Sequence, residues 1–129
     1  ARQTQLTNVR AAVPFTVSLG SAYRNPRKNA AVGGAPESKH MYGDALDTNP
    51  ASSDTLNCGT ATQALITQNA ANMKSLYDNT AAPRILEHGP TQLDEKDARD
   101  LNGDGVPDVF DICLRLDGQF GADHVHIGN

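Results

Sequence analysis

Three of the four histidines in this chain stand in two short stretches that also carry aspartates. The segment SKHMYGDALD contains His40 and Asp47, and the chain ends on DHVHIGN, which contains His124 and His126. Imidazole nitrogens and carboxylate oxygens are zinc ligands, and three of them with an open fourth position make the catalytic form of a zinc site. The two stretches therefore predict a zinc site if the fold brings them together. Spacing alone leaves open that these are ordinary core or surface histidines.

The geometry of a strand supports the zinc site. Residues two apart in a strand face the same side, so His124 and His126 point together. Asp47 ends a predicted strand, and His40 precedes that strand by a turn, with Gly43 suited to a tight return. Two imidazoles and a carboxylate would then meet on one face of a sheet.

A second group of ligand-type residues lies at 94–111, which holds seven carboxylates. An acidic run is ordinarily a solvated face. Here DLNGDGVPDVFD places oxygen side chains and a glycine at the spacing of an EF-hand calcium loop. The predicted calcium ligands are Asp100, Asn102, Asp104, the Val106 carbonyl, Asp108 and Asp111. The closing Asp111 in place of glutamate, together with Pro107, makes the loop resemble thrombospondin type 3 or dockerin-like calcium loops.

The length and composition limit the number of domains and the kinds of partner that the protein can bind. The 129 residues predict one small domain, with an insertion-like calcium loop at 100–111. Hydrophobic residues make up 38% and aromatics 5%, so the core must be built mostly from small aliphatic side chains. The net charge of −4 argues against nucleic acid or an anionic membrane as a partner. No apolar run reaches the roughly 20 residues of a membrane span.

Cys58 and Cys113 lack the C-x-x-C spacing of a zinc ribbon or redox pair. A disulfide between them would imply an oxidising compartment, and two buried thiols are the alternative. The first residues form no hydrophobic signal region. That start is compatible with removal of a signal peptide or of an upstream segment, and the sequence does not distinguish the two.

The elements that must position these groups form a small α+β fold. We expect a central antiparallel sheet with flanking helices and the zinc site on the sheet. Strands are predicted at 14–19, 43–49, 83–89 and 123–128, and a helix at 60–79; residues 24–38 are turn-rich, and 110–116 fit either a strand or a helix.

The segment SKHMYGDALD fits the pattern S-x-H-x-x-G-x-A-x-D at every fixed position. With the later HVH it resembles the zinc D-alanyl-D-alanine carboxypeptidases. Their superfamily includes murein endopeptidases, D,D-dipeptidases of vancomycin resistance, phage endolysins and the signalling domain of hedgehog proteins. SAYRNPRKN resembles the S-x-Y-R-x-P-x-x-N segment of the same family. The resemblance covers residues 14–50 and the last few residues, while 51–120 match no aligned segment.

The resemblance implies a role for each matching residue. His40, Asp47 and His126 become the zinc ligands, and His124 becomes the non-ligating histidine of H-x-H. Exchange of these last two roles is the main alternative. Arg24 is implied to stabilise the anionic intermediate, or else forms a structural ion pair. Ser38 is implied to lie near the substrate.

Hydrolysis also needs a group that takes a proton from water and gives it to the leaving amine. His124 is the first choice because it shares a face with His126. Asp123 stands three residues before His126, a reduced form of the E-x-x-H pattern of some relatives, but in a regular strand it faces away. Glu87 is the third candidate if its strand pairs with the last one. Asp123 and Glu87 are otherwise surface carboxylates.

Together these expectations describe a zinc peptidase that is secreted, periplasmic or associated with the cell wall. Its implied substrate is a peptidoglycan-type peptide, cleaved as by a D-Ala-D-Ala carboxypeptidase or a murein endopeptidase. Zn²⁺ and Ca²⁺ are the expected ions, and a monomer is expected. The alternative is a hedgehog-like binding or signalling domain that carries the same ions with little or no peptidase activity. A third possibility is a domain of a larger wall enzyme.

Overall fold

The computed structural model describes residues 2–21 and 44–129. The first elements along the chain are α1 (Arg2–Ala12), β1 (Val17–Ser21), β2 (Leu46–Pro50), α3 (Ala51–Thr55) and α4 (Gln63–Asn79). They are followed by β3 (Arg84–His88), β4 (Thr91–Gln92), the 3-10 helix η2 (Asp108–Phe110), β5 (Arg115–Leu116), β6 (Gln119–Phe120) and β7 (His124–Ile127). This order confirms an α+β fold.

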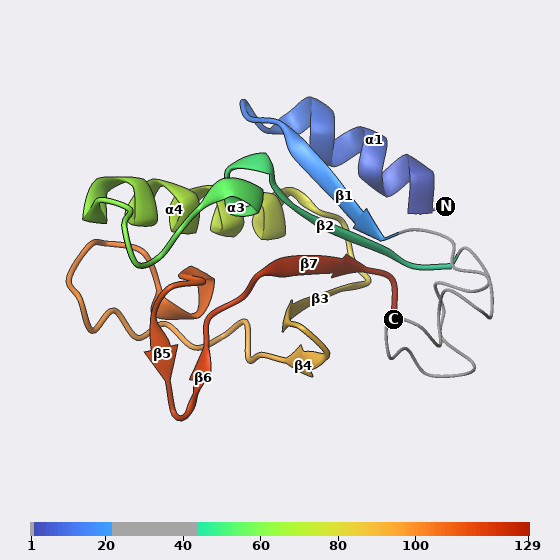
Figure 1. The fold of residues 1–129 in the computed structure, drawn as a ribbon. Helices are drawn as coiled ribbons and strands as arrows, with labels where there is room; N and C mark the ends of the chain where they lie inside the picture. Colours follow the sequence, from blue (N-terminus) through green and yellow to red (C-terminus); the bar gives the residue numbers. More distant parts are fainter. Residues whose placement is uncertain (1, 22–43) are drawn as a thin grey trace, which may run out of the picture.

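The main sheet has five strands in the order β1-β2-β7-β3-β4, and each neighbouring pair is antiparallel. The last strand of the chain, β7, therefore lies in the centre of the sheet between β2 and β3 (Figure 1). β5 and β6 form a separate hairpin. The central place of β7 puts its side chains beside those of two strands that come much earlier in the sequence.

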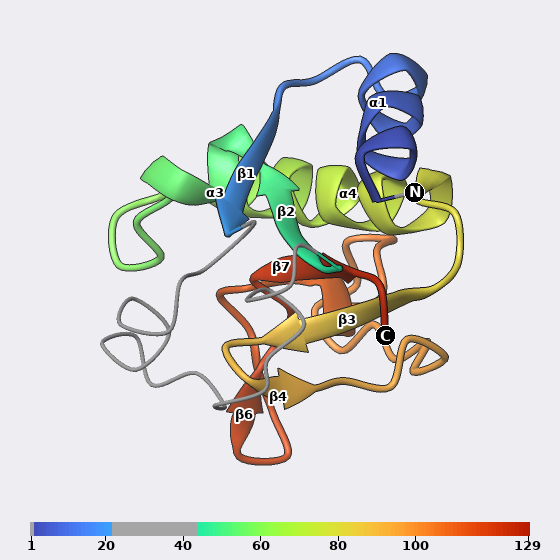
Figure 2. The ribbon, with the colours of Figure 1, turned by 90° about the vertical axis from the view of Figure 1, so that its right-hand side faces the viewer.

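One face of the sheet is apolar and packs against helices. Leu46 in β2, Leu86 in β3, and Val125 and Ile127 in β7 are at most 2% exposed. α4 packs against β2 and β7, and α1 packs against α4 and β7 on the same side (Figure 2). Because side chains alternate along a strand, the residues between these core positions must project from the opposite face.

Helix α4 forms where the sequence predicts its long helix. Thr62 caps it, since its hydroxyl accepts a hydrogen bond from the Leu65 N–H at 3.2 Å. Its buried apolar residues Ala70, Met73, Leu76 and Tyr77 recur at three- and four-residue spacing, which is one face of a helix. That face covers the centre of the sheet.

Helix α1 was not among the predicted elements. Leu6 and Val9, one turn apart, enter the core. The Gln5 amide donates hydrogen bonds to the carbonyls of Ala81 and Pro83, at 2.7 and 3.3 Å. These contacts join the start of the chain to the segment that enters β3.

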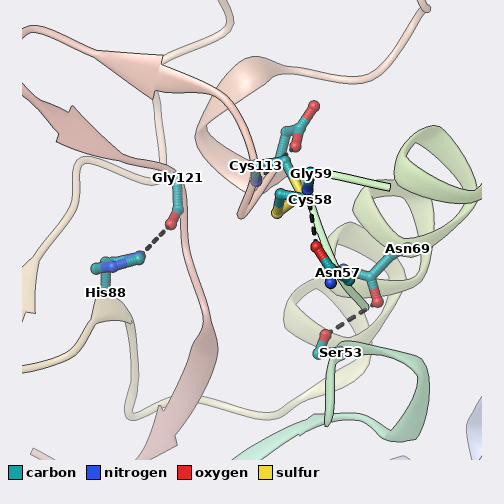
Figure 3. The surroundings of a disulfide bond; sticks show 9 residues. Ser53, Asn57, Cys58, Gly59, Asn69, His88, Cys113 and Gly121 are labelled. Atoms are coloured by element: carbon teal, nitrogen blue, oxygen red, sulfur yellow. Dashed lines mark hydrogen bonds between the residues drawn. A yellow bond between two sulfur atoms is a disulfide. The ribbon is translucent and has the colours of Figure 1, made fainter. Parts of the chain in front are cut away.

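The structure confirms the disulfide between Cys58 and Cys113 (Figure 3). It joins the turn before α4 to the segment that follows η2, residues 55 apart in sequence. Next to it, the Asn57 side chain accepts a hydrogen bond from the Gly59 N–H at 2.9 Å (Figure 3).

Some boundaries differ from the sequence prediction. The first strand is at Val17–Ser21 and not at 14–19. The ambiguous 110–116 segment contains the end of η2 and the short strand β5. The turn-rich segment 24–38 lies outside the described residues. Among the residues that are described, no helix is long and apolar enough to cross a membrane.

Candidate metal centre

The polar face of the sheet carries four side chains with ligand or acid–base chemistry. Asp47 in β2 lies directly opposite His126 in β7. Glu87 in β3 lies directly opposite His124 in β7. Directly opposed residues in an antiparallel pair share a face, and His124 and His126 are two positions apart. All four side chains therefore project from one side of the sheet, away from α4.

Their polar atoms are close together. Asp47 Oδ1 lies 3.0 Å from His126 Nδ1, and Glu87 Oε1 lies 2.8 Å from His124 Nε2. Two longer contacts cross between the pairs: Asp47 Oδ1 to His124 Nε2 at 3.6 Å and Glu87 Oε1 to His126 Nδ1 at 3.8 Å. One ligand atom from each of Asp47, Glu87 and His126 lies within 4.8 Å of the others. This spacing suits a single metal ion bound among them.

Asp123 immediately precedes β7 and contacts His124. Its Oδ1 is 2.6 Å from His124 Nδ1, and both carboxylate oxygens accept the Gly89 N–H at 3.1 Å. Both ring nitrogens of His124 are thus engaged by carboxylates, Asp123 on one side and Glu87 on the other.

These carboxylates control the charge of the two histidines. Burial disfavours a charged His124, but the hydrogen bonds of Asp123 and Glu87 outweigh it and raise the His124 pKa to about 10. The hydrogen bond of Asp47 raises the pKa of His126 against the opposing effect of burial. Without bound metal, His124 is therefore an imidazolium at neutral pH.

A cleft of about 380 Å³ opens beside this cluster. Asp54, on its wall, accepts hydrogen bonds from the Ser18 hydroxyl at 2.7 Å and the Asn49 amide at 2.9 Å, and these bonds lower its pKa. The described lining is Gly20, Asp47, Asn49, Ser53, Asp54, Gly89, Ile112, Asp123 and His124. A peptide bound in this cleft would lie next to the metal centre.

The donor set fits zinc, which binds imidazole nitrogen and carboxylate oxygen. Of the three ligands expected from the sequence, Asp47 and His126 come together on paired strands. The third, His40, lies outside the described residues, as do Ser38 and Arg24. Glu87 was expected as an acid–base candidate conditional on strand pairing, and β3 does pair with β7. Its position within reach of both Asp47 and His126 could not be read from the sequence, because it depends on strand order.

Comparison with protein families gives one decisive match. The sequence pattern of the family described as Peptidase M15 matches residues 2–80, more than half of the chain. The chain belongs to the Peptidase M15 family. It is a zinc metallopeptidase, and membership implies action on peptidoglycan-type peptides. No curated protein and no solved structure matches the chain significantly.

The M15 match contains Asp47 and ends before β3. Glu87, His124 and His126 therefore lie beyond the matched residues. Their association with Asp47 is seen in the sheet pairing and not in the family match.

Proposed function

We propose that this M15 peptidase cleaves cell-wall peptides, as a D-Ala-D-Ala carboxypeptidase or a murein endopeptidase. The single observation that carries the proposal is the convergence of Asp47, His126 and Glu87 on one face of the sheet. We further propose that it acts as a monomer in an extracytoplasmic compartment or at the cell wall. The disulfide supports this location, because such bonds persist in oxidising compartments.

In this proposal His40, Asp47 and His126 hold the zinc ion. Zinc in such a site acts as a Lewis acid that polarises the scissile carbonyl and makes water nucleophilic near neutral pH. Asp47 and His126 are supported by their 3.0 Å contact, and His40 by its place in the motif that also contains Asp47.

Glu87 is the best candidate for the general base. Its Oε1 lies 3.8 Å from the Nδ1 of the proposed ligand His126, so it can reach a water molecule next to the ion. His124 holds a proton between Glu87 and Asp123 and is less suited to accept another. We assign His124 to orienting Glu87 and to stabilising negative charge on the reacting carbonyl. Arg24 and Ser38 keep the substrate-side roles implied by their motifs.

The experiment that tests this function is digestion of purified peptidoglycan, with mass analysis of the products. Zinc-loaded protein should release terminal D-alanine if it is a carboxypeptidase, or open cross-links if it is an endopeptidase. A chelator should abolish the products, and added zinc should restore them. Equal digestion with and without chelator, or no peptide cleavage by the zinc-loaded protein, would contradict the proposal.

The ligand assignment needs its own measurement. Metal analysis of His40→Ala, Asp47→Ala and His126→Ala should show loss of near-stoichiometric zinc. Asp54→Asn is the matched control, since Asp54 lines the same cleft outside the cluster, and it should keep the ion. Full zinc retention in the three alanine variants would refute the assignment.

A further inference from the structure

The loop at 100–111 folds around its own first carboxylate. Both oxygens of Asp100 accept backbone hydrogen bonds, from the Asp104 N–H at 3.2 Å and from the Gly105 N–H at 2.9 Å. The turn needs positive φ at Gly103 (70°) and Gly105 (85°), a conformation that favours glycine. The backbone is thereby wrapped around one acidic side chain.

The next two oxygen-bearing side chains, Asn102 and Asp104, also accept hydrogen bonds from the loop backbone. Asn102 Oδ1 accepts the Asp104 N–H at 3.4 Å, and Asp104 Oδ1 accepts the Val106 N–H at 2.9 Å. The other Asp104 oxygen accepts a hydrogen bond from the Thr67 hydroxyl of α4 at 3.1 Å. Alternate side chains of the loop therefore accept hydrogen bonds from the loop backbone, and Asp104 attaches the loop to α4.

Two buried carboxylates at the end of the loop give an independent reason to expect a cation. Asp108 is 1% exposed and Asp111 is 2% exposed. Within the described part of the chain, Asp108 Oδ1 and Asp111 Oδ2 are buried and have no hydrogen-bond partner. A buried carboxylate oxygen without a partner is costly unless a positive charge meets it. Burial raises the pKa of Asp111, and the charges of Asp104 and Asp108 raise it further.

We infer that residues 100–111 bind one calcium ion. Its ligands are the side-chain oxygens of Asp100, Asn102, Asp104 and Asp111 with the Val106 carbonyl. Asp108 contributes Oδ1 directly or through water, because its Oδ2 already accepts the Leu101 N–H at 2.6 Å. An all-oxygen set in an irregular loop suits calcium, whereas magnesium demands near-ideal octahedral geometry and zinc prefers nitrogen and sulfur.

Binding must also draw the loop inward. Among the described residues, only Asp47, Glu87 and His126 bring three acidic or imidazole ligand atoms within 4.8 Å of one another. The loop carboxylates are spaced more widely, so they close on the ion as it binds.

The loop and the residues just after it are hydrogen-bonded to the segment that leads into β7. The Val109 carbonyl accepts the Ala122 N–H at 2.8 Å, and the Leu114 carbonyl accepts the Gly121 N–H at 3.0 Å. Gly121 and Ala122 lie three and two residues before His124, the first residue of β7. Calcium in the loop would therefore stabilise the segment that leads to His124 and His126.

The test is titration of the full zinc-loaded chain with calcium, followed by calorimetry and thermal unfolding at constant zinc. One calcium ion should bind per chain, and the melting temperature should rise by on the order of 10 °C at a hundredfold excess over Kd. Magnesium should give a much smaller rise. Absence of heat and of any calcium-dependent rise would overturn the inference.

Isosteric variants separate ion binding from loop structure. Asp104→Asn and Asp111→Asn keep an oxygen that can accept the local N–H bonds, yet they should lose most of the calcium-dependent rise. Asp111→Asn should melt no lower than the unchanged protein when calcium is absent, because it removes a buried charge. Asp94→Asn, an exposed position outside the loop, should keep the full rise. Retention of the rise in both loop variants would refute the site, whether or not the zinc assignments hold.

Discussion

Glu87 and His124 share a 2.8 Å contact on the polar face of the sheet, and removing either should test a different role. Glu87→Gln keeps the shape of the side chain but cannot take a proton. Turnover should fall by about two to four powers of ten, the usual effect of removing an acid–base group. Zinc content should be kept, and Glu95→Gln, an exposed glutamate away from the cluster, should leave turnover unchanged. Loss of zinc in Glu87→Gln would instead make Glu87 a ligand.

His124→Ala should lower turnover over the same range of about two to four powers of ten while most of the zinc stays bound. The physical reason is the loss of the positive charge that orients Glu87. Metal analysis beside steady-state kinetics checks both parts. If His124→Ala loses the ion and His126→Ala keeps it, the ligand and the assisting residue are exchanged.

The charge of His124 predicts a pH dependence for the protein stripped of metal. Its folded pKa of about 10 lies above the ordinary value of 6.5. The stabilisation from its protonated form is therefore complete below about pH 6.5 and is lost as the pH rises toward 10. Urea unfolding of the stripped protein between pH 6 and pH 10 should show this decline. His124→Gln should show a shallower slope, and equal slopes would contradict the assigned charge.

At the scale of elements, the local patterns were predictable and their arrangement was not. The alternation in GDALDTN and DHVHIG predicted the strands observed as β2 and β7. The near-helical spacing of apolar residues at 60–79, such as Ala71 and Leu76, predicted the helix observed as α4. Strand order depends on pairing between residues such as Asp47 and His126, which are far apart in sequence. Helix α1 was missed because its apolar stripe is narrow, with Leu6 and Val9 as its buried apolar residues. Tertiary contacts with α4 and β7 stabilise it.

Gly121 lies close to the end of the acidic loop, residues 100–111, and this contact gives a prediction about packing. A Cβ at position 121 would overlap the Asp111 carbonyl oxygen and lie 2.8 Å from that of Asp108. Gly121→Ala should therefore destabilise the fold by about 1–3 kcal/mol, as overpacking does. Gly20→Ala is the control, because its nearest neighbour would be at 3.6 Å, an ordinary contact. Equal unfolding midpoints for the two variants in urea would show that the loop moves aside freely.

At the scale of the whole molecule, the candidate metal centre combines residues from within the family match with residues that follow it. Asp47 belongs to the residues that match the M15 family, and His126 comes from the last strand. Because β7 lies between β2 and β3, the sheet cannot form with this order until β7 is in place. Strand β7 therefore both completes the sheet and supplies His126 to the candidate metal centre.

The Cys58–Cys113 disulfide should contribute to stability across this whole arrangement. It links residues 55 apart and encloses α4, β3 and the acidic loop, so its loss frees a long loop in the unfolded chain. Replacing both cysteines by serine should lower the free energy of unfolding by about 2–5 kcal/mol. Urea unfolding with and without reductant measures this. Each single serine variant should lose as much as the double variant, because either one removes the bridge. An unchanged unfolding free energy after complete reduction, verified by alkylation and intact mass, would show that the packed core alone maintains the fold.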